Sequence, residues 1–234
     1  MRIGVVTIFP EVMDEILAMG MLSVAEKKGL VEYRTLSPRE FTEDVHQSVD
    51  DEPYGGGAGM VMMAPPIVDA VESLAPDPGS PVILLSPGGK RFDQAEAERL
   101  AGCDNLTFVC GRYKGVDERV RELVITEELS IGDYVLSGGE LAAGVVIEAV
   151  VRLRDEVLGD RESGETDSFA RGREGLLDCA WYTRPQEYRG LEVPETLLSG
   201  HHAEIEKWRR RSSLERTRRV RPDLLDGRDE DNDT

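Results

Sequence analysis

The segment IGVVTIF, at residues 3–9, is rich in apolar and β-branched side chains and is typical of a buried strand. Pro10 follows directly, and residues 11–19 continue with a helical pattern, so the strand runs straight into a helix. The same alternation recurs along the chain. Further strands are predicted at 31–36, 82–85 and 106–110, and further helices at 67–74, from 93 onward, at 116–123 and at 141–153. Strands alternating with helices over about 155 residues predict an α/β domain with a mostly parallel sheet.

Two polar turns carry the S-x-x-E spacing of a helix capping box. Ser37 and Glu40 form the ends of the first turn, and Ser137 and Glu140 form the ends of the second. The second turn stands immediately before the apolar helix predicted at 141–153. We therefore expect a helix to begin at each turn.

The alternation of strands and helices ends near residue 158, and we expect the α/β domain to span 1–158. Residues 159–175 are mostly glycine, serine and charged residues, with Phe169 as the only large apolar side chain, which is typical of a linker. Residues 191–221 are helical in composition without a strand signal, and an acidic tail follows. The sequence therefore predicts a small, all-helical second domain at 176–234.

Charge sets one segment apart from the rest of the chain. The sequence has 28 Lys and Arg against 46 Asp and Glu, a net charge of −18, which by itself argues against a nucleic-acid partner. Residues 207–221, KWRRRSSLERTRRVR, reverse this balance with eight basic residues and one acidic residue. Trp208 beside three arginines favours contact with phosphates and bases. The alternative is a solvated helix face.

Composition also excludes several classes of protein. The longest apolar run, residues 141–147, has 7 residues, against the ~18 that a membrane-spanning helix needs, so we expect no membrane contact. The N-terminus has no small-residue cleavage site of a secretory signal, and we expect a cytoplasmic protein. Cys103, Cys110 and Cys179 are an odd number without C-x-x-C spacing, which argues against a disulfide framework and a zinc knuckle.

Three glycine-rich turns lie at residues 54–59, 86–89 and 130–140. Glycine lets the backbone approach a ligand closely, and its N–H groups then act as donors. None of the turns is a P-loop, and none has the G-x-G-x-x-G spacing of a dinucleotide fold. Each alone is compatible with a plain tight turn. Together, they favour a small ligand at the carboxyl edge of the sheet.

Five longer blocks occur along the chain: DDEPYGGGAGMVMM (50–63), CGRYKGVDERV (110–120), SIGDYVLSGGE (130–140), TDSFARGREGLLDCAWYTRP (166–185) and SGHHAEIEKWRR (199–210). They resemble, in the same order, the signature blocks of the bacterial tRNA (guanine-37-N1)-methyltransferase family, TrmD. The resemblance extends from residue 1 to about residue 225. It implies methylation of N1 of the guanosine next to the anticodon.

The resemblance implies a fold of the SPOUT class, in which the C-terminal part of the α/β domain forms a deep trefoil knot. It also implies S-adenosylmethionine as methyl donor, and an obligate homodimer with each active site at the subunit interface. The residues that the resemblance assigns to the cofactor are Leu84, Leu85, Ser86, Pro87, Gly89, Gly111, Tyr113, Ile131, Gly132, Asp133, Tyr134, Val135, Leu136, Gly138 and Gly139. Backbone groups of such loops can recognise an adenine edge without charged side chains.

Guanine N1 is a poor nucleophile while it is protonated, so its methylation needs a base and a donor that stabilises charge on O6. The resemblance assigns the base to Asp167 and the donor to Arg152. From the pattern alone, Asp167 is compatible with an ordinary loop carboxylate, and Arg152 with a cation that complements a helix dipole. The alternatives are a SPOUT methyltransferase acting on another RNA position and a non-catalytic RNA-binding protein.

Contacts with the anticodon arm of tRNA are expected on both predicted domains. The candidate residues are Tyr54, Gly57, Gly59, Lys114, His201, Lys207, Arg209, Arg210 and Arg211. Lys114 departs from the family, which commonly has Glu there, and that carboxylate is associated with a magnesium requirement. A requirement of this chain for Mg²⁺ is therefore uncertain, because Lys114 can itself supply positive charge. We expect no protein metal site, because the adjacent histidines His201 and His202 are poor co-ligands.

Overall fold

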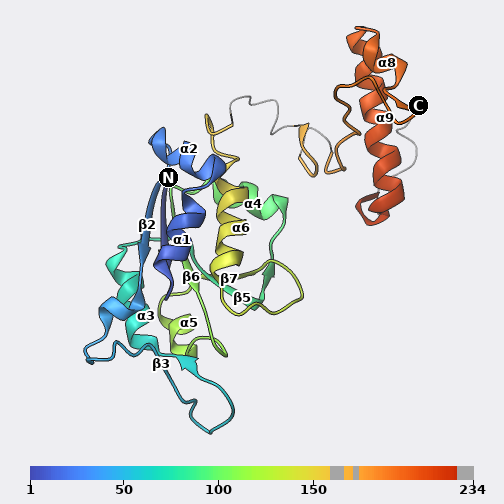
Figure 1. Cartoon of the computed structure of the whole chain (residues 1–234). Coiled ribbons are helices and arrows are strands. Elements are labelled where there is room, and N and C mark those ends of the chain that lie inside the picture. Colours follow the sequence, from blue (N-terminus) through green and yellow to red (C-terminus); the bar gives the residue numbers. More distant parts are fainter. Residues whose placement is uncertain (159–165, 171–173, 226–234) are drawn as a thin grey trace. The chain divides into compact units, whose positions relative to one another are not determined.

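The first unit of the chain, Met1–Gly159, is built around five parallel strands. In the computed structural model, residues 1–158, 166–170 and 174–225 are described. The strands are β1 (Arg2–Val6), β2 (Glu32–Leu36), β5 (Val82–Arg91), β6 (Asn105–Cys110) and β7 (Glu127–Ser130), in the order β2-β1-β6-β5-β7 (Figure 1). The predicted α/β fold with a mostly parallel sheet is confirmed.

Helices cover both faces of this sheet. One face carries α1 (Pro10–Leu17), α2 (Gly20–Lys27), α4 (Gln94–Ala101) and α6 (Glu140–Val151), and the other carries η1 (Pro38–Phe41), α3 (Ala64–Ser73) and α5 (Glu118–Leu123). Side chains alternate along each strand, so that Leu85 packs in the first core cluster and Leu84 in the second. A short hairpin, β3 (Asp50–Asp51) and β4 (Val61–Met62), flanks the glycine-rich turn at 54–59.

Strand β7 was not predicted from the sequence. Its first two residues are the charged Glu127 and Glu128, so the segment lacks the apolar pattern that is typical of a buried strand. In the folded chain, Glu127 pairs with Arg99 at 2.6 Å and Glu128 with Arg121 at 2.8 Å. These ion pairs join residues that are 28 and 7 positions apart, and sequence periodicity does not reveal them.

The first expected capping box is present and the second is not. The Ser37 hydroxyl accepts a hydrogen bond from the backbone N–H of Arg39, and Glu40 accepts one from Ser37 N–H, at the start of η1. Helix α6 instead has Gly139 as its N-cap, without a side-chain cap. Glu140 turns into the interior, where it accepts a hydrogen bond from the Thr7 hydroxyl at 2.7 Å. The partner of the Glu140 carboxylate is therefore the buried Thr7 hydroxyl and not a group of the predicted capping box.

The second unit, Asp160–Thr234, contains α8 (Glu195–Leu198), α9 (His202–Val220) and η3 (Pro222–Leu225). It also contains a hairpin of β8 (Glu187–Tyr188) and β9 (Leu191–Glu192), so the expectation of an all-helical domain is wrong in this respect. The hairpin turns at Arg189 and Gly190, which have φ values of 54° and 79°. Its two-residue strands are too short to show an alternating pattern in the sequence.

Helix α9 holds the preceding segment by hydrogen bonds from small polar side chains. The Thr217 hydroxyl accepts from Leu177 N–H, and the Ser213 hydroxyl donates to the Leu177 carbonyl. Both side chains are buried, which explains why this helix has few apolar residues on its packed face. Within the described part of the chain, no helix is long and apolar enough to span a bilayer.

Candidate functional site

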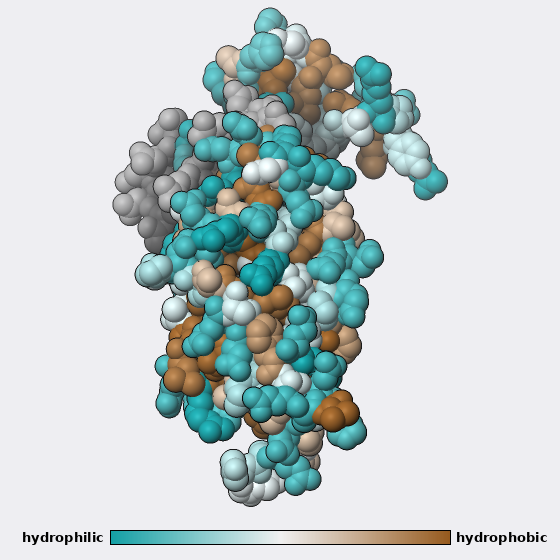
Figure 2. Space-filling model, turned by 90° about the vertical axis from the view of Figure 1, so that its left-hand side faces the viewer, coloured by the Kyte–Doolittle hydropathy of each residue, from teal (hydrophilic) through white to brown (hydrophobic). Residues whose placement is uncertain are grey.

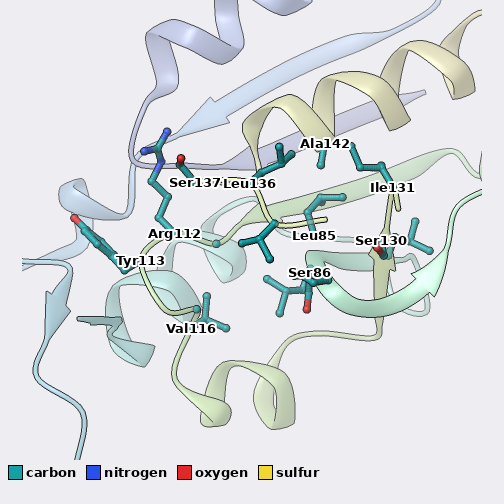
Figure 3. Close-up of a pocket in the computed structure, with 18 of the residues that line it drawn as sticks. Leu85, Ser86, Arg112, Tyr113, Val116, Ser130, Ile131, Leu136, Ser137 and Ala142 are labelled. Carbon is teal, nitrogen blue, oxygen red and sulfur yellow. The ribbon is translucent and has the colours of Figure 1, made fainter. Parts of the chain in front are cut away.

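A pocket opens at the carboxyl ends of β5, β6 and β7, where the loops that follow these strands meet. Figure 3 shows Leu85, Ser86, Ile131 and Leu136 gathered in it, with the Tyr113 ring off to one side. Thirteen of the fifteen residues expected to contact the cofactor line this pocket: Leu84, Leu85, Ser86, Pro87, Gly111, Tyr113, Ile131, Gly132, Tyr134, Val135, Leu136, Gly138 and Gly139. The structure therefore brings together two of the three glycine-rich turns.

The loop after β7 is held against the loop after β6 by backbone contacts. Gly139 N–H donates to the Gly111 carbonyl at 3.0 Å, and Arg112 forms an antiparallel bridge with Gly138. A β-carbon on Gly139 would stand 2.8 Å from the Cα atom of Cys110, so only glycine fits. The two loops therefore form one wall of the pocket, built from main chain.

Gly89 and Asp133 are the two expected cofactor residues that do not line the pocket. Asp133 is exposed. A β-carbon on Gly89 would stand 2.5 Å from the backbone nitrogen of Leu129, so this glycine lets the end of β5 lie directly on β7. Gly89 therefore belongs to the contact between β5 and β7, beside the pocket.

Eight further residues line the pocket and were not singled out from the sequence: Arg112, Gly115, Val116, Arg121, Leu129, Ser130, Ser137 and Ala142. Most of them stand next to singled-out residues within the same quoted blocks. Their position beside those residues in the sequence is the signal that could have identified them as pocket residues. Leu129 and Ala142 lie in regular elements, and only the fold shows which of their faces meets the pocket.

Three cations line the pocket, and two of them are engaged elsewhere. Arg112 lies 3.4 Å from the buried carboxylate of Glu140 and stacks over the Phe9 ring, with its guanidinium carbon 4.2 Å from the ring centroid. Arg121 pairs with Glu128, whose carboxylate raises the pKa of the guanidinium. Lys114 forms no ion pair with any residue that the structure describes.

Lys114 connects the pocket to the glycine-rich turn between β3 and β4. Its backbone N–H donates to the Met60 carbonyl at 3.0 Å. A β-carbon on Gly59 would stand 3.1 Å from the Lys114 side chain, so the two residues touch. Tyr54 and Gly57, the other expected substrate contacts of this turn, lie in the open and do not line the pocket.

The two expected catalytic residues lie in different units. Arg152 is the C-cap of α6, at the far end of this helix from the pocket-lining Ala142. Twelve residues of helix separate the two ends, which corresponds to ~18 Å. Asp167 belongs to the second unit, where its backbone carbonyl accepts from Ala170 N–H at 3.2 Å. Neither Arg152 nor Asp167 is among the residues that line the pocket.

The basic residues of α9 that are expected to bind RNA lie close to glutamates. Lys207 pairs with Glu204 and Arg209 with Glu206, while Arg210 and Arg211 lie 3.3 Å and 3.9 Å from Glu174 and Glu215. His201 is exposed at the N-cap of the same helix. These pairs are solvent-exposed, and each partly offsets the positive charge that the sequence displays.

Clusters that could hold a metal ion were sought among residues 1–158, 166–170 and 174–225. No group of three or more His, Cys, Asp or Glu side chains is placed to do so there. Cys110 lies behind the pocket wall and is completely buried, and this burial raises the pKa of its thiol. The protonated thiol is not a nucleophile.

Comparison with known proteins identifies close relatives over nearly the whole chain. The family model described as tRNA (Guanine-1)-methyltransferase TrmD matches residues 1–227. A tRNA (guanine-N(1)-)-methyltransferase of Halalkalibacterium halodurans is 50% identical over 230 residues, which cover 97% of this chain and 92% of that protein. Enzymes of the same name from Brevibacillus brevis and Bordetella parapertussis are each 50% identical, over 97% of this chain and 92% and 90% of their own.

Proposed function

The chain belongs to the tRNA (guanine-1)-methyltransferase family TrmD, and from this membership we propose that it methylates N1 of guanosine 37 in tRNA, with S-adenosylmethionine as methyl donor. It is a tRNA (guanine-N(1)-)-methyltransferase. The observation that carries the finer proposal is the pocket, which gathers thirteen residues assigned to the cofactor at one sheet edge. We also propose that the enzyme acts in the cytoplasm.

The residues of the pocket fit S-adenosylmethionine by their chemistry. Backbone groups of Ile131 and Leu136 would hold the adenine edge, and the apolar side chains of Leu85 and Ala142 would contact its faces. Gly132 has a φ of 149°, a conformation that glycine adopts readily, and its N–H and carbonyl are hydrogen-bonded to Ser130 and Tyr134, which fixes the shape of this loop. When bound, the cofactor supplies an electrophilic methyl group.

We propose that the loops around this pocket form the trefoil knot of the SPOUT class. The contact of Gly139 with Cys110 supports this proposal, because it presses the start of α6 against the end of β6. The contact of Gly89 with Leu129 likewise joins the ends of β5 and β7. A threaded chain requires close main-chain contacts of this kind.

The position of Arg152 supports an active site shared between two subunits. It lies ~18 Å along α6 from the pocket end of the helix, which is far from the pocket of its own subunit. We therefore propose that the Arg152 acting at each pocket comes from a second copy of the chain. Apolar side chains are exposed on the two adjacent helices α1 and α6, with Val12 at 45%, Leu141 at 63% and Val145 at 51%. We propose that this surface is covered in a homodimer.

In the proposed reaction, Asp167 removes the proton from guanine N1 as the methyl group is transferred. Arg152 donates hydrogen bonds to O6, where negative charge gathers as the proton leaves. The pocket contributes by fixing the methyl donor in line with N1, so that proximity supplies much of the rate. N1 lies on the Watson–Crick edge, so the target base must be unpaired when it enters the site.

The test of this function is methyl transfer from labelled S-adenosylmethionine to an unmodified tRNA with G at position 37. We expect N1-methylguanosine as the product nucleoside, identified by mass spectrometry after digestion. A matched tRNA with A at position 37 should accept no label. Label in any other nucleoside, or equal labelling of the two tRNAs, would overturn the assignment to guanosine 37.

A second prediction concerns Lys114, which reaches both the pocket and the Gly59 turn. We expect the unaltered protein to methylate prefolded tRNA with little stimulation by Mg²⁺, because Lys114 already places a positive charge there. Lys114→Glu should slow single-turnover transfer by at least about tenfold without Mg²⁺, and added Mg²⁺ should restore part of the rate. Strong stimulation of the unaltered protein by Mg²⁺ would contradict the prediction.

A further inference from the structure

Four large side chains of the second unit form two contact pairs, which we call the aromatic cluster. Trp181 and Tyr182 belong to the segment before the β8–β9 hairpin, and Trp208 and Arg209 belong to α9. The Tyr182 and Trp208 rings meet edge to face with centroids 6.1 Å apart, and the Arg209 guanidinium carbon lies 5.0 Å from the Trp181 ring centroid. These are two contact pairs made by the same two segments, since Trp181 adjoins Tyr182 and Trp208 adjoins Arg209 along the chain.

Two of the three rings of this cluster are exposed although they are large. The exposed fractions are 61% for Trp181 and 48% for Tyr182. The buried positions of this unit are filled by other residues, including Leu176 and Cys179. Figure 2 shows that hydrophobic side chains reach the surface in small groups among hydrophilic ones. Exposed rings that do not fill the interior are available to bind another molecule.

The Trp181 indole is held in a fixed orientation. Its Nε1–H donates to the Asp178 carboxylate at 2.6 Å, and the other oxygen of that carboxylate accepts from Cys179 N–H at 2.7 Å. Asp178 N–H in turn donates to the Ser168 hydroxyl at 2.9 Å. An exposed ring fixed at its polar edge loses little conformational freedom when another flat group stacks on it.

The charges of this unit argue that stacking supplies much of its RNA contact. Residues 174–225 carry ten basic and nine acidic side chains, a net charge of +1. Four of the cations of α9 pair with glutamates, as described above. Attraction of phosphates is therefore weak here, whereas an aromatic ring with an adjacent arginine binds the flat face of any base.

We propose that Trp181, Tyr182 and Arg209 form a stacking surface for an unpaired base of the RNA substrate, with Trp208 supporting Tyr182 from α9. This inference rests on the proposed function, because it takes the RNA to be the substrate of methyl transfer. The base is an unstacked nucleotide, since a ring within a duplex has both faces covered. Nucleotides of a loop, such as those near the anticodon, meet this condition.

The two tryptophans allow a direct optical test. In the full-length Trp208→Phe variant, Trp181 is the only tryptophan, and its fluorescence reports on the cluster. We expect titration with unmodified tRNA, and with a short single-stranded oligoribonucleotide, to quench this emission at saturation. A blunt duplex of the same length should quench much less. Absence of quenching by saturating tRNA would overturn the proposal.

Substitutions at Trp181 separate stacking from simple apolar contact. Trp181→Phe keeps a ring and should bind tRNA within about threefold of the unaltered chain, whereas Trp181→Leu should bind about tenfold more weakly. The slope of log Kd against log salt should stay the same in both variants, since no phosphate contact is lost. Equal affinities of the two variants for tRNA would overturn the proposal. Thermal melting checks that both variants fold.

The outcomes also distinguish this inference from the proposed function. If tRNA is methylated at N1 of guanosine 37 while Trp181→Leu binds it unchanged, the function stands and the stacking surface is wrong. If Trp181 emission is quenched by the oligoribonucleotide while no tRNA is methylated, the function fails and the stacking surface stands. Emission that changes with protein concentration without RNA would show that a second copy covers the cluster, which overturns the inference.

Discussion

Replacing Asp167 by alanine is expected to slow methyl transfer to guanine N1 by about a hundredfold to ten-thousandfold, the range typical for loss of a general base. Without the carboxylate, the N1 proton has no positioned acceptor and must pass directly to water. Single-turnover labelling of tRNA with the enzyme in excess measures this step, because product release does not then limit the rate. Binding of the cofactor should be unaffected.

Two variants control this experiment. Thr166→Ala changes the exposed neighbouring residue and should leave the rate within about twofold. Asp167→Asn keeps the shape of the side chain but cannot accept the proton, so it should be nearly as slow as Asp167→Ala. A rate of Asp167→Asn close to that of the unaltered chain would show that the residue positions the substrate by hydrogen bonding and is not the base.

The second large effect is expected at Gly89. A β-carbon there would stand 2.5–2.6 Å from backbone atoms of Glu128 and Leu129, which cannot move without separating β5 from β7. Gly89→Ala should lower the free energy of unfolding by about 3 kcal/mol or more, as overpacking against rigid neighbours does. For a chain of this size that corresponds to a fall in Tm of about 6–12 °C. Cofactor binding should weaken in parallel, because both strands end in the pocket.

Gly88→Ala is the matched control for this prediction. The nearest atom to a β-carbon at Gly88 is the Ser86 hydroxyl at 3.6 Å, an ordinary contact distance. The two variants make the same chemical change at adjacent positions of one turn. Equal melting temperatures for Gly88→Ala and Gly89→Ala would refute the view that Gly89 is required by the contact with β7.

Local sequence patterns predicted the parts of the fold in which each element is apolar by itself. Residues 3–9 and 106–110 correspond to strands β1 and β6, which lie at the centre of the sheet. Strand β7 was missed because Glu127 and Glu128 find their cations on α4 and α5. Ion pairs between separate elements are set by the tertiary fold, and a periodic pattern carries no trace of them.

The candidate site could be predicted where glycine is required by close main-chain contact. Gly139 lines the pocket where a β-carbon would collide with the Cys110 backbone, and Gly132 lines it with a φ of 149° that favours glycine. Arg112 was missed because its position depends on Glu140, a residue whose spacing from Ser137 indicated a cap. A carboxylate near a helix start can bond to the nearby backbone of the cap or to side chains that are distant in sequence. The spacing of residues in the sequence indicates only the first of these.

Glu140 has a further consequence for the pocket beside it. The start of a helix carries the equivalent of about half a positive charge, which ordinarily attracts anionic groups of ligands. At α6 the first residue is a buried carboxylate, 3% exposed, that lies against this helix start. This carboxylate offsets both the positive helix start and the Arg112 guanidinium 3.4 Å away, so the wall opposes a sulfonium cation such as that of the proposed cofactor less than Arg112 and the helix start alone would.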